Sequence, residues 1–427
     1  MFCGLITAKR GTIVIPWPMP DRNHGTCHAD SYGSRRGKED YMMKKKILFI
    51  SEALWIGGIE TALVNLLNRM DYEKYDVTCL VVRGSLEIAD RITPKCRLLV
   101  ADREKAFSFS ETYKYSRLYH LTERCENPSR LHRCLMWAVP AIKWMENRLY
   151  IRYIRKQMKG EHFDTCVIYS DRTAEIAVRA ICADRYLLFY HHGAIRREYH
   201  DEIGYRKSDK IIAVSEAVEQ KLRAFRPRHA QKMMTIHNLT DVEGIRRKAE
   251  EPIPETFPRD QFNIVSCGRV SHEKGMDLAV EACAQLVEMG HENIHWWIVG
   301  GGPAENEVRE RITALHMENH VTMLGMKENP YPYIKQADLY VQPSRFESYG
   351  LTIAETMVLG KQIVSTDTDG AHILAELEPA VCLCAGIPGR IAAAVAGFLN
   401  KKPVLAATGN AVEKENQRAQ AQLETLL

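Results

Sequence analysis

The chain has 427 residues, too many for one ordinary core and enough for two domains of about 200 residues each. Apolar residues make up 45% and charged residues 26%, which is typical of a soluble globular protein and not of a disordered or fibrous one. A formal net charge of +4 is too small to indicate a nucleic-acid binder. No apolar run reaches the roughly 20 residues that a membrane-spanning helix requires.

Twelve cysteines are scattered singly along the chain, and the closest pair, Cys382 and Cys384, lacks the spacing of metal knuckles and redox motifs. This predicts reduced, mostly buried thiols in a cytoplasmic protein, with neither a metal ion nor a cofactor. Residues 1–42 have no continuous apolar core of a signal peptide, because charged residues and prolines interrupt the run at Ile13–Ile15. We interpret 1–42 as a disordered extension, or as an upstream misreading of a start at Met42 or Met43.

From residue 43 the pattern alternates between strands and helices. An apolar run, a glycine loop at Gly57-Gly58 and a helical period of leucines come first. Strands are predicted at Ile47–Ile50, Val77–Val82, Thr165–Tyr169, Leu187–Tyr190 and Lys210–Val214. This alternation predicts a parallel sheet covered by helices on both faces, in a Rossmann-like domain spanning 43–240.

A second domain is predicted for residues 241–400. The stretch from Asp241 to Pro258 has the prolines and charges of a linker. The alternation then restarts, with strands at Phe262–Ser266, Ile294–Val299, Val321–Leu324, Leu339–Gln342 and Gln362–Ser365. The fold class is therefore α/β, with two doubly wound parallel-sheet domains. Within 401–427, residues Asn410–Leu427 predict a polar helix that either packs on the first domain or simply ends the chain.

The segment 111–160 departs from this alternation. Eleven lysines and arginines are mixed there with Trp137, Trp144, Tyr150 and Tyr153. Basic residues beside aromatic ones suit a helix on an anionic membrane surface. A solvated helical face with ordinary core aromatics explains the pattern equally well.

Two basic residues follow the first strand of the second domain. Arg269 offers a planar fork and Lys274 a mobile point charge, and together they suit the two phosphates of a diphosphate at the carboxyl end of a strand. The turn Gly300-Gly301-Gly302 lacks the third glycine of a dinucleotide fingerprint, since Glu305 takes its place. We interpret it as a turn that lets backbone approach the ligand, with a purely structural turn as the alternative.

Two glutamates flank the next strand-to-helix loop. Glu347 lies in the loop and Glu355 in the first turns of a helix whose N-terminus favours phosphate. Carboxylates beside a diphosphate are costly unless they accept hydroxyl hydrogens. Sugar hydroxyls are the natural partners, so the pair predicts a nucleotide-sugar site.

The chain resembles the family-4 retaining glycosyltransferases of the GT-B fold, which carry a Glu, seven residues, Glu element. Here it reads Glu347-Ser-Tyr-Gly-Leu-Thr-Ile-Ala-Glu355, and Arg269, Lys274 and the loop Gly57-Gly58-Ile-Glu60 occur in the family's order. The resemblance extends from about Lys46 to Leu399. It departs from the family at His237-Asn238-Leu239, where Pro-Asn-Gly is common.

This resemblance implies a role for each matching residue. Glu347 would contact the transferred sugar, together with His192, or alternatively His191, at a strand end. The remaining residues that the resemblance assigns to donor binding are Gly57, Gly58, Arg269, Lys274, Met326, Lys327, Ser348, Tyr349, Gly350, Leu351 and Glu355. Asp367-Thr-Asp369 could suggest a metal pair, but its position matches the family's metal-free sugar-contacting loop.

The implied function is transfer of a sugar from a nucleoside-diphosphate sugar, expected to be a UDP-sugar, to a hydroxyl of a glycan or lipid-linked acceptor with retention of configuration. Cell-surface polysaccharide or glycolipid synthesis on the inner membrane face is the expected setting. A non-catalytic nucleotide-sugar-binding homologue is the main alternative. A GT-B epimerase or phosphorylase and a pyridine-nucleotide oxidoreductase are two further ones.

Overall fold

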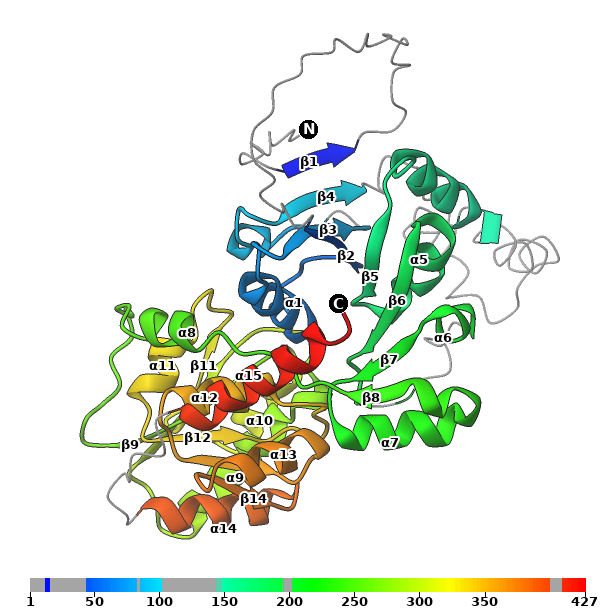
Figure 1. Ribbon diagram of the computed structural model, residues 1–427. Helices are drawn as coiled ribbons and strands as arrows, with labels where there is room; N and C mark the ends of the chain where they lie inside the picture. Colours follow the sequence, from blue (N-terminus) through cyan, green and yellow to red (C-terminus); the bar gives the residue numbers. More distant parts are fainter. Residues whose placement is uncertain are drawn as a thin grey trace, which may run out of the picture. The chain divides into compact units, whose positions relative to one another are not determined.

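The computed structural model describes residues 12–15, 44–82, 85–101, 144–145, 147–193, 195, 202–399 and 409–427. Two compact units emerge, one of residues 1–189 and 199–210, the other of residues 190–198 and 211–427. We describe each unit by itself (Figure 1). Within the described residues, none of the helices combines the length and apolarity needed to cross a bilayer.

The first sheet is parallel and has the strand order β1-β4-β3-β2-β5-β6-β7-β8. Its strands are β1 (Thr12–Ile15), β2 (Lys45–Ser51), β3 (Tyr75–Val81), β4 (Arg97–Ala101), β5 (Phe163–Ile168), β6 (Ala183–Tyr190), β7 (Lys210–Ala213) and β8 (Met233–Thr235). The register pairs Ile47 with Val77 on one side of β2 and with Thr165 on the other. Strand β2 is therefore central, which is why its residues Ile47–Ile50 are apolar throughout and fully buried.

Short helices accompany this sheet. They are α1 (Gly58–Arg69), α5 (Ala174–Ala180), α6 (Glu202–Lys207) and α7 (Glu216–Phe225), and residues 147–157 are also helical. The next helix, α8 (Val242–Lys248), packs instead against α11 (Tyr331–Gln336) and α12 (Leu351–Val358) of the second unit. Helix α1 buries Leu63, Leu66 and Leu67 at the predicted helical spacing.

The second sheet is also parallel, with the order β11-β10-β9-β12-β13-β14. Its strands are β9 (Phe262–Cys267), β10 (Ile294–Val299), β11 (Val321–Gly325), β12 (Leu339–Gln342), β13 (Ile363–Thr366) and β14 (Val381–Cys384). Strand order reverses between β9 and β12, and such a switch point is where ligands bind in doubly wound sheets. The prediction of two doubly wound parallel sheets is confirmed.

Besides α8, seven helices of the described residues belong to the second sheet and its C-terminal extension. They are α9 (Met276–Glu288), α10 (Glu305–Ala314), α11 (Tyr331–Gln336), α12 (Leu351–Val358), α13 (Asp369–Leu377), α14 (Pro388–Leu399) and α15 (Asn410–Glu424). Helix α15 lies against α12 (Figure 1).

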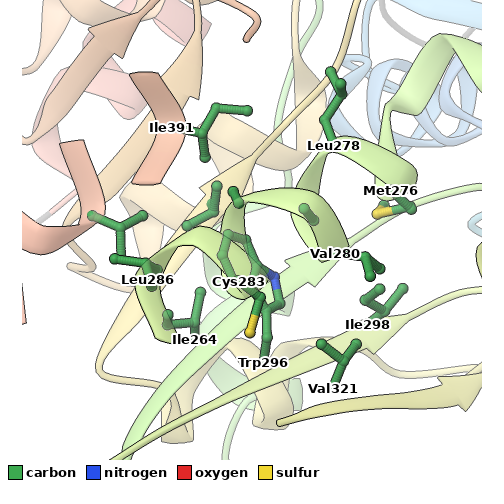
Figure 2. Close-up of a cluster of buried hydrophobic side chains, with 14 of the residues drawn as sticks. Ile264, Met276, Leu278, Val280, Cys283, Leu286, Trp296, Ile298, Val321 and Ile391 are labelled. Atoms are coloured by element: carbon green, nitrogen blue, oxygen red, sulfur yellow. The ribbon is translucent and has the colours of Figure 1, made fainter. Parts of the chain in front are cut away.

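A core of apolar side chains joins α9 to this sheet. Figure 2 shows Cys283 of α9 beside Trp296 of β10, Leu286 beside Ile264 of β9, and Val280 beside Ile298 of β10. Trp296 is fully buried and its indole N–H donates to Ser266 Oγ at 3.0 Å, which satisfies the one polar atom of the ring. Each large apolar side chain buried in this way stabilises the unit by roughly 1.5 to 3 kcal/mol.

Candidate nucleotide-sugar site

Glu347 lies in the loop between β12 and α12, where three donors hold its carboxylate. Lys274 Nζ is 2.6 Å from Glu347 Oε1, Ser344 Oγ is 2.7 Å from it and Gln342 Nε2 is 3.1 Å from it. All three act on Oε1, so the second oxygen, Oε2, is left for a ligand hydroxyl. The structure thus joins two residues that are 73 positions apart, Lys274 and Glu347, which the sequence analysis assigned to one site without pairing them.

A buried polar network beneath this pair fixes the end of β12. Gln342 and Ser344 are essentially without solvent exposure, and the Tyr340 hydroxyl lies near both Gln342 Oε1 and Cys267 O. Gln342 Nε2 in turn donates to Ser344 Oγ at 2.7 Å. A network whose members are satisfied in a low-dielectric interior is rigid, so Glu347 occupies a defined position.

Charges on Lys274 and Glu355 both act on the end of β9. Burial raises the pKa of the Cys267 thiol to about 12, the charge of Glu355 raises it further, and the charge of Lys274 lowers it. Glu355 is itself only 8% exposed, and its carboxylate accepts a hydrogen bond from the Tyr331 hydroxyl at 3.3 Å. The two glutamates therefore differ: one is paired with a lysine, the other with a phenol.

Arg269 is exposed, and no ion pair of its guanidinium occurs within the described residues. A second arginine, Arg345, is instead paired with protein groups. It binds both carboxylate oxygens of Asp277 at 2.8 and 2.6 Å and donates to His272 O at 2.9 Å. Because Asp277 opens α9, Arg345 fastens the glutamate loop to the turn that carries Lys274.

The loop 348–351 leads directly into α12. Gly350 has φ +84° and stands at the helix N-cap, a left-handed position that glycine adopts without strain. Tyr349 is buried, whereas Ser348 and Leu351 are partly exposed. The Ile353 amide donates to Gly350 O at 2.9 Å. The amides that precede it at the start of the helix, Leu351 and Thr352, are of the kind that binds phosphate at helix N-termini.

The glycine turn after β10 has a structural reason. A Cβ at Gly300 would lie 1.8 Å from Gly268 O, and one at Gly302 would lie 2.3 Å from Val270 O. These glycines let the turn after β10 pack on the turn after β9. The structural alternative for this motif is thus sufficient to explain it.

Met326 and Lys327 follow β11. Met326 is 63% exposed. Lys327 forms an ion pair with Glu255, which also accepts a hydrogen bond from the Tyr333 hydroxyl at 2.6 Å. The Lys327 ammonium is thereby occupied, and what this segment offers a ligand is its backbone and the Met326 side chain.

His191 and His192 follow β6, and the structure distinguishes them. His191 is buried, while His192 is partly exposed and lies edge-on to Tyr190 with ring centroids 5.6 Å apart. A Cβ added at Gly193 would lie 3.5 Å from the backbone nitrogen of Ser348. This histidine turn and the glutamate loop are therefore neighbours within the second unit.

In the first unit, Gly57 is the N-cap of α1 and Gly58 its first residue. A Cβ at Gly57 would lie 2.6 Å from Glu60 Oε2, so a larger residue would displace that carboxylate. Burial raises the pKa of Glu60, and the charges of Glu52 and Glu87 raise it as well.

Asp367 and Asp369 each pair with a different side chain. Asp367 binds His372 and Asp369 binds Lys221. Within the described residues, no group of three or more His, Cys, Asp or Glu side chains is placed to hold a metal ion.

The basic aromatic segment is described only in part, since Trp137 and the rest of 102–143 lie outside the described residues. Tyr150 and Tyr153 are buried, and the Tyr150 hydroxyl lies within hydrogen-bond distance of the carbonyl oxygens of Val82 and Ala101. These tyrosines are core residues. Trp144, by contrast, is 59% exposed.

Sequence reasoning missed Gln342, Ser344, Arg345 and Tyr331 as site residues. Ser344 stands three positions before Glu347 and could have been found from that spacing, since short hydroxyl side chains often bond within loops. Tyr331 is 24 positions from Glu355 in the sequence, and no motif around either residue indicates that they are in contact.

Comparison with known proteins agrees with this geometry. The family described as Glycosyltransferase Family 4 matches residues 56–243, and the family described as Glycosyl transferases group 1 matches residues 247–415. The lipopolysaccharide core biosynthesis mannosyltransferase LpsB of Rhizobium meliloti is 28% identical over 184 residues, which are 38% of this chain and 52% of that protein.

An N-acetylgalactosaminyltransferase of Campylobacter jejuni that is named for an undecaprenol-diphosphate-linked acceptor is 29% identical over 163 residues, 38% of this chain and 42% of that protein. The chain thus spans about half the length of the curated relatives it matches. The crystal structure of Anabaena HepE with UDP and glucose superposes with a TM-score of 0.62 and 16% identity, over 89% of this chain and 99% of that one. With both matched segments, the two sheets and the intact glutamate element, the chain belongs to the family-4 glycosyltransferases of the GT-B fold.

Proposed function

We propose that this chain transfers a sugar from a UDP-sugar to a hydroxyl of a glycan or lipid-linked acceptor, with retention of configuration. The observation that carries the proposal is the Lys274–Glu347 pair at the switch point of the second sheet. One end of this pair offers a cation to a diphosphate and the other an unused carboxylate oxygen to a sugar. A relative that acts on lipopolysaccharide core and a structural neighbour with bound UDP and glucose support the same class of substrates.

Each part of the sugar donor would be bound by protein groups of matching chemistry. Arg269, Lys274 and the first amides of α12 would bind the diphosphate, and Glu355 would accept hydrogens from the ribose hydroxyls. Glu347 Oε2, with His192, would accept hydrogens from the sugar. The buried network behind Gln342 keeps these groups in place before the donor arrives, which lowers the reorganisation needed for reaction.

Transfer needs no protein nucleophile in this proposal. The bond between the anomeric carbon and the diphosphate oxygen breaks as the acceptor oxygen attacks from the same face. The acceptor proton passes to an oxygen of the departing diphosphate. Lys274 and Arg269 stabilise the negative charge that develops on that group.

A panel of nucleotide sugars, assayed for release of the nucleoside diphosphate, tests the function. We expect turnover with one or more UDP-sugars and its loss in Glu355→Ala, with Glu376→Ala as a control. Glu376 lies on α13 of the same unit and takes no part in the site. Full activity of Glu355→Ala with the true donor would contradict the site assignment. Binding of UDP-sugars without turnover towards any acceptor would favour the non-catalytic alternative.

We also propose that the helix at 147–157 brings the protein to an anionic membrane from the cytoplasmic side. Trp144, Met145 and Leu149 are each half or more exposed, and the Arg148 guanidinium lies 4.2 Å from the centre of the Trp144 ring. Arg152 is exposed one turn further on. Apolar and basic side chains on one exposed face suit the headgroup region of anionic lipid.

Sedimentation with phosphatidylglycerol vesicles tests this contact. We expect the wild type to bind and Trp144→Ala with Leu149→Ala to bind several-fold less, since both side chains supply apolar area. Met289→Ala, which removes an equally exposed apolar side chain on the second unit, is the control. Wild-type protein that stays in the supernatant would contradict the proposal.

A further inference from the structure

His237 stands where the chain departs from the family's Pro-Asn-Gly pattern, in the turn that follows β8. Its side chain is 6% exposed. Nδ1 lies 2.7 Å from Glu415 Oε1 and Nε2 lies 3.0 Å from Glu216 Oε2. An ionised carboxylate can only accept, and a neutral imidazole has only one N–H, so two such contacts require both nitrogens to donate. The geometry is that of an imidazolium cation.

The charged groups around this ring agree with that protonation state. Burial alone lowers the pKa of His237, but hydrogen bonds to Glu415 and Glu216 outweigh burial and raise it. The same contact lowers the pKa of Glu415, to which Arg418 contributes from 3.6 Å. Among the described residues, the other titratable group against the ring is Tyr349, whose pKa is raised, chiefly by burial.

Tyr349 connects this ion cluster to the glutamate loop. Its ring centroid lies 5.4 Å from that of His237, and the side chain is 3% exposed. Behind it, a Cβ at Gly370 would lie 2.5 Å from the Tyr349 backbone, and the Gly370 amide donates to Glu347 O at 3.1 Å. A shift of Tyr349 would therefore move the backbone of Glu347.

Helix α15 holds the other side of the same turn. Asn416 donates to Thr240 O and accepts from the Thr240 amide, both at 2.9 Å. Glu415 is the preceding residue, so the helix offers this turn the side-chain amide of Asn416 and the carboxylate of Glu415 from neighbouring positions. The terminal helix is thereby bound to the turn that carries His237.

We propose that His237 is a positioning residue for the glutamate loop: its imidazolium, held between Glu216 and Glu415, packs on Tyr349 and fixes Glu347 in its place. The consequence for donor binding rests on the proposed function. The consequence for the order of the loop does not, because it concerns this chain without any ligand. Loss of the proton removes one of the two hydrogen bonds and loosens the loop.

Two measurements on the full chain test the proposal, each at about pH 6 and about pH 9, on either side of the range in which histidine titrates. The first is hydrogen exchange of the amides of 345–350, corrected for intrinsic rates. We expect exchange in the wild type to rise about fivefold or more with pH, and to be fast at both values in His237→Gln. The second is the dissociation constant of UDP, which we expect to follow the same pattern.

His162→Gln is the matched control, since it breaks an exposed histidine–carboxylate pair, that with Asp184 at 3.1 Å. Glu415→Gln keeps the shape of its side chain and should reproduce His237→Gln. If His237→Gln does not fold, Glu216→Gln, at a half-exposed position, takes its place. Equal loop exchange in wild type and folded His237→Gln at both pH values would overturn the proposal. Failure of UDP to bind the wild type would contradict the proposed function alone, because loop exchange still decides this inference.

Discussion

Two cation–carboxylate clusters flank the same short loop, residues 345–350, and they differ in the cation. At one end Lys274 binds Glu347, and at the other His237 stands between Glu216 and Glu415. Histidine is the side chain whose charge changes between pH 5 and 8, and lysine is not. The two clusters therefore differ in whether their cation is of the residue type that titrates near neutral pH.

The clusters also differ in what they leave open. In Glu347, the three donors all bind one carboxylate oxygen, Oε1, and not Oε2. In His237, by contrast, both ring nitrogens bind protein carboxylates. The first arrangement suits chemistry on a ligand and the second suits holding a loop. The comparison teaches that two ion pairs beside one loop serve different ends, according to which atoms of the buried side chain, Glu347 or His237, remain unused.

The largest expected effect comes from the lysine cluster. Lys274→Met should lower kcat/KM for the donor about 10² to 10³-fold, because it removes the charge that stabilises the departing diphosphate. It also leaves Glu347 without its cation. Steady-state release of UDP measures the effect, and Lys335→Met, which breaks an ion pair with the exposed Glu250, is the control. If the activity of Lys274→Met stayed within about twofold of wild type, the conclusion that the lysine cluster acts on the ligand would be wrong.

A double-mutant cycle is the next test. Glu347→Gln should lower kcat/KM by one to two orders of magnitude, since the amide keeps an oxygen for Ser344 but loses the charge that holds Lys274. The double variant should have a kcat/KM only slightly lower than that of Lys274→Met alone, because either change by itself already breaks the 2.6 Å ion pair. Additive losses would show that the two residues act independently.

The sequence predicted most strands of the two sheets well, but it predicted the side-chain contacts between distant segments poorly. Long apolar runs such as Ile294–Val299 coincide with β10, because buried parallel strands are apolar on both faces. Strands β1, β4, β8 and β14 were missed, and β1 lies within the segment 1–42 that was interpreted as disordered. Strand β8 has only three residues, Met233–Thr235, too few to show a period, although the apolar Val381–Cys384 of β14 could have been found.

The candidate site shows the same division. Lys274 and Glu347 were predicted from motif order, and the structure places them in contact. The partners that hold the loop, Arg345 to Asp277 and His237 to Glu415, join residues 68 and 178 positions apart. No local pattern encodes such pairs, because they arise from the packing of separate elements. The departure from the family pattern at His237 was visible in the sequence, but its contacts with Glu216 and Glu415 were not.

A smaller effect is expected at the second glutamate. Tyr331→Phe removes the hydroxyl that donates to Glu355 at 3.3 Å and leaves the ring in place. One hydrogen bond to a carboxylate at this distance is worth about 1 kcal/mol, so KM for the donor should change by about five-fold with kcat nearly unchanged. Tyr333→Phe, whose hydroxyl binds Glu255, is the control. A change in kcat alone would show that Tyr331 acts on the reacting sugar instead.

The smallest expected effect is on stability, and its sign follows from the titration of the histidine cluster. Hydrogen bonds to Glu415 and Glu216 raise the pKa of His237 above 6.5 despite its burial, so the stabilisation is complete below pH 6.5 and is lost as pH rises through the raised value. The lowered pKa of Glu415 sets the acid limit, because its contribution is lost only as pH falls below 4.5. Urea unfolding should therefore show wild type exceeding His237→Gln by about 1 kcal/mol at about pH 6, and by less at about pH 9. The lysine cluster should show no such dependence, since Lys274→Met should destabilise equally at both values. A His237→Gln deficit that does not change with pH would mean that the ring contributes packing and no charge, and the contrast between the two clusters would then lie in their geometry alone.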